Sequence, residues 1–187
     1  MDEREEYGLV LDFLPQGKAT DRERRAVAQV IGEKYFTMLE VILKENVTLS
    51  IQQRVYIGKD DRKEIEKIKG RVSYEELTSA ARSELERTVR KIVEERQEDF
   101  VRFFNKCGSI SIRLHQLELL PGIGKKHMRE LLEQREEKPF ESFEDLQKRV
   151  ALMPDPANVL TARISDELQG KSQHYIFVRP PFRKEQF

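Results

Sequence analysis

Apolar and polar residues alternate through much of the first third of the chain, as they do in strands with one buried face. Every second residue over 7–13 is apolar, which predicts a first strand with those four side chains on one face. The segment 31–43 is rich in β-forming residues, and its apolar residues occur at both odd and even positions. This predicts one long strand that bulges or bends. Alternation also predicts strands over 49–57 and 65–74. The N-terminal third is therefore expected to be rich in β-structure.

The strand predicted over 65–74 alternates apolar residues with three basic ones, Lys67, Lys69 and Arg71. A few curved strands of this length, with a turn at 15–18 after the first, suggest a small closed barrel of the oligonucleotide-binding (OB) type. Such a barrel binds its ligand on one strand face, so the basic stripe is a candidate contact surface, together with Arg54 and Tyr56. The alternative is that these charges only keep exposed strands soluble and block edge pairing.

The hydrophobic period changes to three and four after Tyr74, which predicts helices. An apolar stripe over 77–93 is followed by the charged run 94–99, interpreted as a turn or kink between two helices. The aromatic residues over 100–104 have helical spacing, so we expect them in a core and not on a base-stacking platform. Gly108 is expected to stop this second helix.

A glycine-rich turn between two amphipathic segments is the most informative stretch of the chain. The spacing predicts a helix over 112–119 with Ser111 as its N-cap, and a second helix over 125–135. Between them, Pro121 ends the first helix, and two glycines flank an apolar residue expected to turn inward. Amides at the start of a helix point outward as donors, so this turn is predicted to hold a phosphate. The alternative is an ordinary helical corner with a glycine cap.

A second pair of helices is expected over 143–150 and 157–168, capped by Ser142 and Asp155. The turn between them, 151–156, lacks a Gly-x-Gly sequence and carries an acidic cap, so it is predicted to be structural. The segment 174–178 is interpreted as one more short strand that returns to the barrel.

These patterns predict an α+β chain in four parts. They are an OB-like β-barrel over 1–74, a connecting helix or helices over 75–108, a paired helical domain over 109–170, and a short strand and tail over 171–187.

Charge and composition limit the possible functions. The chain has 34 basic and 34 acidic residues among 187, so the net charge is zero and any nucleic-acid surface has to be local. There is one cysteine, and the three histidines lack ligand spacing, so we expect no metal and no cofactor. The sequence shows no apolar signal region and no apolar run of membrane length, which predicts a cytoplasmic protein without a membrane partner.

Several stretches resemble known families. The sequence Leu-Pro-Gly-Ile-Gly-Lys-Lys over 120–126, with the apolar helix and the Pro-Phe-Glu-Ser-Phe-Glu-Asp-Leu sequence over 139–146, resembles a helix-hairpin-helix motif. Nearly the whole chain resembles an archaeal family of unknown function, DUF655, on residues 11–18, 54–59, 103–105 and 113–126. This resemblance implies RNA binding through an OB-like domain joined to a paired helix-hairpin-helix domain, and it implies no reaction.

The leading hypothesis is therefore a non-enzymatic nucleic-acid-binding protein, with RNA favoured over DNA by the family resemblance alone. The candidate site residues are Gly122, Ile123, Gly124, Lys125, Lys126, Arg129, Arg54, Tyr56, Lys67, Lys69 and Arg71. A protein–protein adaptor, on a ribosome or in a repair complex, is the alternative. A metal-dependent nuclease is weaker, because the acidic residues Asp12, Asp60 and Asp61 match no defined carboxylate site.

Overall fold

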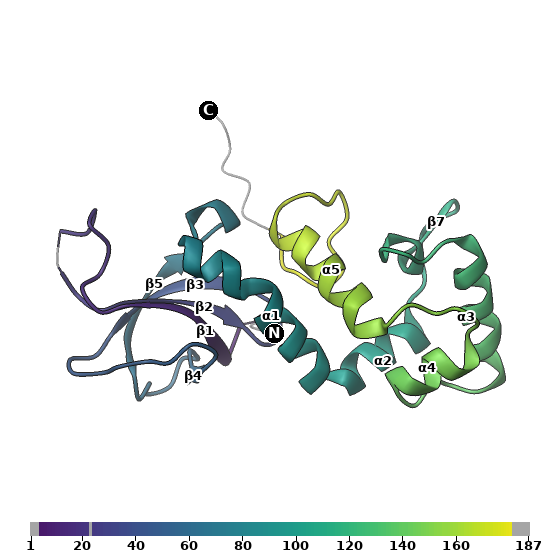
Figure 1. Ribbon diagram of the computed structural model, residues 1–187, viewed down its shortest axis with the longest axis horizontal. Coiled ribbons are helices and arrows are strands. Elements are labelled where there is room, and N and C mark those ends of the chain that lie inside the picture. The colour runs from purple at the N-terminus through teal and green to yellow at the C-terminus, as the bar shows by residue number, and fades with distance from the viewer. Residues whose placement is uncertain (1–3, 23, 181–187) are drawn as a thin grey trace. The chain divides into compact units, whose positions relative to one another are not determined.

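The structure, a computed structural model, describes residues 4–22 and 24–180 (Figure 1). Over these residues it holds a five-stranded antiparallel sheet, a two-stranded hairpin and five α-helices, which confirms the mixed α+β class. The sheet strands are β1 (Tyr7–Leu14), β2 (Val27–Gly32), β3 (Met38–Leu43), β4 (Arg54–Tyr56) and β5 (Ile65–Arg71). The later elements are α1 (Ser79–Glu95), α2 (Gln97–Lys106), β6 (Ser109–Ser111), β7 (Leu114–His115), α3 (Lys125–Glu137), α4 (Phe143–Arg149) and α5 (Pro156–Leu168). No helix in the described residues is both long and apolar enough to cross a bilayer.

The chain divides into two compact units. The sheet unit comprises residues 1–88 and 166–187, and the helical unit comprises 89–165. The division falls inside α1 and inside α5, whereas the sequence placed domain borders at 74, 108 and 170; those borders stay predictions.

The sheet has the strand order β4-β1-β2-β3-β5, with antiparallel neighbours throughout, and it is curled (Figure 1). Its interior is apolar. The interior cluster consists of Val10, Ala28, Val30, Leu39, Val41, Leu43, Leu49, Val55, Ile57 and Ile65. Register shifts interrupt β1 once and β5 twice against their neighbours. Bulges of this kind bend strands and increase their twist, which is how so short a sheet curls.

The predicted single apolar face over 7–13 is wrong. A register shift lies between Val10 and Asp12, and it is Val10 and Phe13 that pack on the interior cluster. Leu9 and Leu11 are also buried, so β1 is apolar on both faces, and strict alternation misassigned it.

The predicted long strand over 31–43 is also wrong, because the chain reverses within it to form the β2–β3 hairpin. Phe36 lies in the turn with φ +54°, and the amide of Gly32 donates to the carbonyl of Thr37 at 2.9 Å. The carboxylate of buried Glu5 accepts hydrogen bonds from the amides of Lys34, Tyr35 and Thr37 at 2.9–3.0 Å. An acceptor from outside the segment therefore organises the turn, and the local pattern could not reveal it.

The strand predicted over 49–57 is reduced to β4, three residues long, since Gln52 adopts φ +62° and turns the chain. The strand predicted over 65–74 ends at Arg71, and Tyr74 begins the short 3-10 helix η1 (Tyr74–Glu76). The side-chain oxygen of Thr78 accepts from the amide of Ala81 at 3.0 Å and so caps α1.

The predicted break in the charged run is confirmed, because α1 ends at Glu95 and α2 begins at Gln97. Phe100, Val101 and Phe104 are buried as expected. In the same unit, Asn105 joins α2 to the segment before α4. Its amide group donates to the carbonyl of Phe140 at 2.9 Å and accepts from the amide of Phe140 at 2.8 Å.

The helix predicted over 112–119 does not form, and Ser111 is not an N-cap. Ser109–Ser111 and Leu114–His115 instead pair as the β6–β7 hairpin, followed by one 3-10 turn, η2 (Gln116–Leu119). His115 provides the cap: its Nδ1 accepts from the amide of Leu117 at 3.1 Å, and its own amide donates to Glu118 at 2.9 Å. Helical structure therefore starts at 116, which leaves room for only one turn before Pro121.

The two later helices match their predictions. Ser142 caps α4 by accepting from the amide of Asp145 at 3.0 Å, and Asp155 accepts from the amide of Ala157 at 3.0 Å at the start of α5. Gly170 follows α5 with φ +70°.

The strand predicted over 174–178 does not form. The carboxylate of Glu167, 1% exposed, accepts hydrogen bonds from the amides of Ile176, Phe177 and Val178 at 2.8–3.0 Å. Because these amides bind a side chain, they are not available to a strand partner. The segment still returns to the sheet unit, where the amide of Arg179 donates to the carbonyl of Tyr35 at 3.4 Å.

Candidate nucleic-acid interface

The glycine-rich turn joins η2 to α3 through two glycines that play different parts. Gly122 has φ +80°, a conformation that favours glycine, whereas Gly124 is the N-cap of α3 with φ −88° and ψ −177°. A Cβ atom at Gly124 would meet nothing within 4 Å, so its backbone faces open space. Ile123 is buried as predicted, and its amide donates to the carbonyl of Leu120 at 3.0 Å.

The turn lies against the second turn of the helical unit, the segment 151–155. A Cβ atom at Gly122 would lie 3.5 Å from Cγ of Pro154. Glu130 of α3 accepts from the amide of Ala151 at 2.7 Å, and buried Arg163 of α5 donates to the carbonyl of Leu119 at 3.2 Å. These contacts fix the turn on both sides and leave the start of α3 exposed.

The three N-termini of α3, α4 and α5 differ in how their first amides are satisfied. α4 and α5 have side-chain caps, from Ser142 and Asp155. α3 has no side-chain cap, and within the described part of the chain no hydrogen bond involves the amides of Lys125, Lys126 or His127. An α-helix leaves its first amides without an internal acceptor, so these three point to solvent.

Three cations surround these amides. Lys125, Lys126 and Arg129 are exposed, and across residues 4–22 and 24–180 no salt bridge or hydrogen bond engages their side chains. Their spacings of three and four residues put them on one side of the first turns of α3. Sequence and structure thus bring together all six candidate residues over 122–129.

The two candidate residues of β4, Arg54 and Tyr56, make contacts with other residues of the sheet unit. Arg54 donates to both carboxylate oxygens of Glu33, at 2.7 and 3.1 Å, and its guanidinium carbon lies 3.6 Å from the ring centre of Tyr7. Tyr56 packs edge-on against Tyr7, with 5.2 Å between ring centres, and its hydroxyl donates to Asp60 at 3.2 Å. The hydrogen bond to Glu33 raises the pKa of Arg54.

Lys69 of β5 is likewise part of an ion-pair network. Its ammonium group contacts Asp21 at 2.7 Å and buried Glu40 at 2.9 Å, and Lys18 also pairs with Glu40. Burial alone would raise the pKa of Glu40, but the hydrogen bonds from Lys18, Lys69 and Gln29 outweigh it and lower that pKa. Lys69 is therefore structural in this arrangement.

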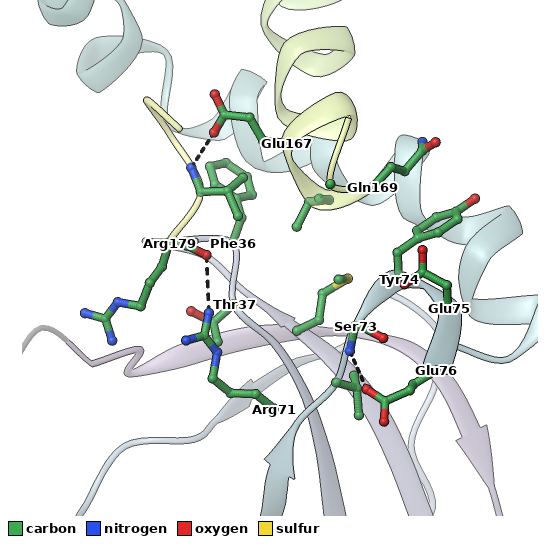
Figure 2. A pocket seen from close by; sticks show the side chains of 15 residues that line it. Phe36, Thr37, Arg71, Ser73, Tyr74, Glu75, Glu76, Glu167, Gln169 and Arg179 are labelled. Atoms are coloured by element: carbon green, nitrogen blue, oxygen red, sulfur yellow. Dashed lines mark hydrogen bonds between the residues drawn. The ribbon is translucent and has the colours of Figure 1, made fainter. Parts of the chain in front are cut away.

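Lys67 and Arg71 complete the predicted stripe, but their settings differ. Lys67 is exposed, and among the described residues no acidic group lies within 4 Å of its ammonium group. Arg71 donates to the carbonyls of Arg179 and Pro180 at 3.3 and 3.4 Å and lines a cavity (Figure 2). The stripe is thus not one uniform basic surface.

Sequence reasoning missed Arg179, which meets Arg71 across 108 positions of the chain. No periodic signal in the sequence links residues so far apart. Among the described residues, no group of three or more His, Cys, Asp or Glu side chains could hold a metal ion. Burial raises the pKa of the single thiol, Cys107, to about 11, so it is a poor nucleophile at neutral pH.

Comparisons with known proteins agree with one another. The family model described as protein of unknown function (DUF655) matches residues 4–179. An uncharacterized protein of Methanocaldococcus jannaschii is 42% identical over 177 residues, which cover 94% of this chain and 80% of that protein. The crystal structure of Af1531 from Archaeoglobus fulgidus matches with a TM-score of 0.85 at 42% identity, over 94% of this chain and 100% of that one.

Proposed function

Since the chain belongs to the family described as protein of unknown function DUF655, we propose its function from the site itself: it binds nucleic acid and catalyses no reaction. The turn over 122–129 holds a backbone phosphate, and RNA is the favoured ligand on the family resemblance. In this interpretation the two turns of the helical unit form a helix-hairpin-helix pair, and the curled sheet is an OB-like barrel.

The observation that carries the proposal is the cationic, uncapped N-terminus of α3. Lys125 and Lys126 lie in its first turn, which has no acidic residue and no side-chain cap, whereas its C-terminal end carries both signs, with Arg135 and the C-cap Lys138 beside Glu136 and Glu137. The two lysines oppose the helix dipole, at a cost of about 0.3–1 kcal/mol for each charge. α4 has the favourable order, with acidic residues in its first turn and basic ones in its last. A phosphate bound at α3 would offset the unfavourable cations.

The sheet unit has a smaller part in this proposal. Of its candidates, Lys67 is the cation that the fold leaves available, whereas Arg54 and Lys69 would have to break ion pairs to reach a phosphate. We therefore expect the hairpin to supply most of the salt-dependent affinity, and the sheet to add little through its stripe.

A salt titration of RNA binding tests the proposal. Each phosphate contact on a single strand contributes about 0.7 to the slope of log K against log salt. The double variant Lys125→Gln/Lys126→Gln is therefore expected to bind more weakly at low salt and to lower that slope by about 1.4. Filter binding of a labelled single-stranded RNA at several salt concentrations measures both quantities.

The matched control is Lys138→Gln/Lys148→Gln, which removes the same charge from the same unit. Lys138 and Lys148 already pair with Glu141 and Glu144, so their loss is expected to leave the slope close to that of the parent. Equal slopes for the two double variants would contradict the proposal.

A protein–protein adaptor is the second candidate, and exposed apolar side chains in the helical unit favour it. Ile112, at the tip of the β6–β7 hairpin, is fully exposed, and Leu152 is 88% exposed. Isolated exposed apolar residues are common, but two on loops of one unit suit a protein contact. Partners that co-purify after complete nuclease digestion would support this function over RNA binding.

A further inference from the structure

Two cavities in the sheet unit share one wall. The larger has a volume of about 720 Å³ and the smaller of about 250 Å³. Both are lined by Thr37, Arg71 and Arg179, so they meet at this pair of guanidinium groups. Figure 2 shows Arg71 and Arg179 on one side of the larger cavity and Tyr74 with Glu75 on the other.

The smaller cavity is strongly cationic. Five basic residues of the described chain line it, and these are Arg4, Lys59, Arg62, Arg71 and Arg179. The one acidic residue among its described lining is Glu5, whose carboxylate accepts hydrogen bonds from the three amides of the β2–β3 turn. A concave surface lined by one sign of charge concentrates ions of the opposite sign.

Backbone carbonyls and an aromatic ring help to hold the arginines in place. Arg71 donates to two backbone carbonyls, Arg62 donates to the carbonyl of Gly58 at 2.8 Å, and Arg179 lies 5.2 Å from the ring centre of Tyr35. Burial and then the positive charge of Arg179 lower the pKa of Arg71, and the charge of Glu5 acts in the opposite direction. A guanidinium that is held in place matches phosphate geometry well, so two of them on one wall suit a phosphate group.

The larger cavity has a different character. Phe36, Met38 and Val178 give it an apolar wall, and all three are buried. Tyr74, Glu75 and Gln169 add an aromatic ring and hydrogen-bonding groups on the other side (Figure 2). Sites for small organic ligands combine such walls in volumes of about 300–1,000 Å³.

We propose that the two cavities bind a nucleoside phosphate, with the phosphate between Arg71 and Arg179 and the nucleoside in the larger cavity. The ligand is either a free nucleotide or the terminal nucleotide of an RNA chain, since both present the same chemistry. This inference does not rest on the hairpin, because every residue that it uses belongs to the sheet unit.

Calorimetric titration of the full chain with AMP, adenosine and inorganic phosphate tests the proposal. AMP is expected to bind at least about tenfold more tightly than either of the other two, because it fills both cavities. Arg179→Gln is expected to weaken AMP binding by about tenfold to a hundredfold, as expected for the loss of a charge-assisted hydrogen bond. Val72→Phe, which narrows the larger cavity, is expected to weaken AMP binding and to leave phosphate binding unchanged.

Lys63→Gln is the matched control, since it removes one exposed positive charge of the same unit that lines neither cavity. Thermal unfolding of each variant shows whether it is folded. No heat with AMP at about 1 mM would overturn the proposal, as would equal AMP affinity in Arg179→Gln and the parent. Equal binding of phosphate and AMP would overturn the assignment of the nucleoside to the larger cavity.

A second arm distinguishes the two sources of the ligand. A short RNA with a 5′-phosphate and the same RNA with a 5′-hydroxyl are each competed against AMP. Competition by the phosphorylated RNA alone identifies a chain terminus, and competition by neither identifies a free nucleotide. The Lys125→Gln/Lys126→Gln variant is expected to bind AMP like the parent, so a failure of the hairpin proposal would leave this result unchanged.

Discussion

Two buried glutamates satisfy backbone groups that strand pairing would otherwise satisfy. Glu5 accepts from three amides of the β2–β3 turn, and Glu167 accepts from three amides after α5. Hydrogen bonds from amides to a carboxylate are short and strong. A Cβ atom at Gly32 would lie 2.0 Å from Cδ of Glu5, so the glycine makes room for the acid. Both residues look like ordinary surface acids in the sequence.

His115 acts at the same scale, and its role predicts a pH dependence. Burial and then the charge of Arg135 lower the pKa of His115. The unfolded chain therefore takes up this proton at a higher pH than the folded chain, and the free energy of unfolding falls as the pH decreases through that range. We expect the melting temperature to fall from about pH 8 to about pH 5, with His115 as one contributor.

His115→Asn isolates this contribution, because asparagine is a good N-cap that does not titrate. The variant is expected to show a shallower fall in melting temperature over the same range, measured by circular dichroism. His115→Ala, which removes the cap, is expected to lose about 1 kcal/mol of stability at about pH 8, where the imidazole is neutral, and less as the pH falls. An unchanged pH profile in His115→Asn would show that the histidine is not the titrating group.

At the scale of elements, β5 carries two lysines with different roles, two positions apart. One is part of an ion-pair network, and the other is available to a ligand. Lys69 neutralises buried Glu40, whereas Lys67 has no acidic partner within the described residues. Lys69→Gln is therefore expected to lower the free energy of unfolding by about 1–2 kcal/mol, at the low end for a charged group because Lys69 is partly exposed. Lys67→Gln is expected to change it by less than about 0.5 kcal/mol. Urea unfolding of both variants measures the difference, and equal effects would contradict the assigned roles.

Elements with local causes were predicted correctly from the sequence. The caps Ser142 and Asp155, the break before Gln97 and the helix from Lys125 depend on residues within one turn. Segments whose partners lie far along the chain were misassigned. The 31–43 hairpin depends on Glu5, and the extended segment 174–178 depends on Glu167. Periodicity carries no information about such acceptors.

The candidate site also has a part that depends on neighbouring residues and a part that depends on residues far along the chain. The turn over 122–129 depends on its own glycines and charges, so the sequence was sufficient to assemble it. The basic stripe looked uniform because its counter-ions, Asp21 and Glu40, lie 48 and 29 positions from Lys69. The pairing of Arg71 with Arg179 required the fold.

For the whole molecule, equal numbers of acidic and basic residues mean that function depends on which charges the fold leaves without partners. Surface pairs such as Lys138–Glu141 and Lys148–Glu144 use many of the cations. Lys125, Lys126 and Arg129 keep their charge beside three outward-pointing amides. The central claim is that this site, and not the bulk charge, anchors a nucleic-acid backbone.

Gly124→Asp tests that claim most directly. Position 124 has room for a side chain and N-cap geometry, so aspartate is expected to cap α3 and to keep or raise the melting temperature. Its carboxylate would also occupy the amides and repel phosphate, so RNA affinity at low salt is expected to fall by at least about tenfold. Gly124→Ser, a neutral cap, is the control and is expected to lose less affinity. A Gly124→Asp protein that is folded and binds RNA as tightly as the parent would contradict the account.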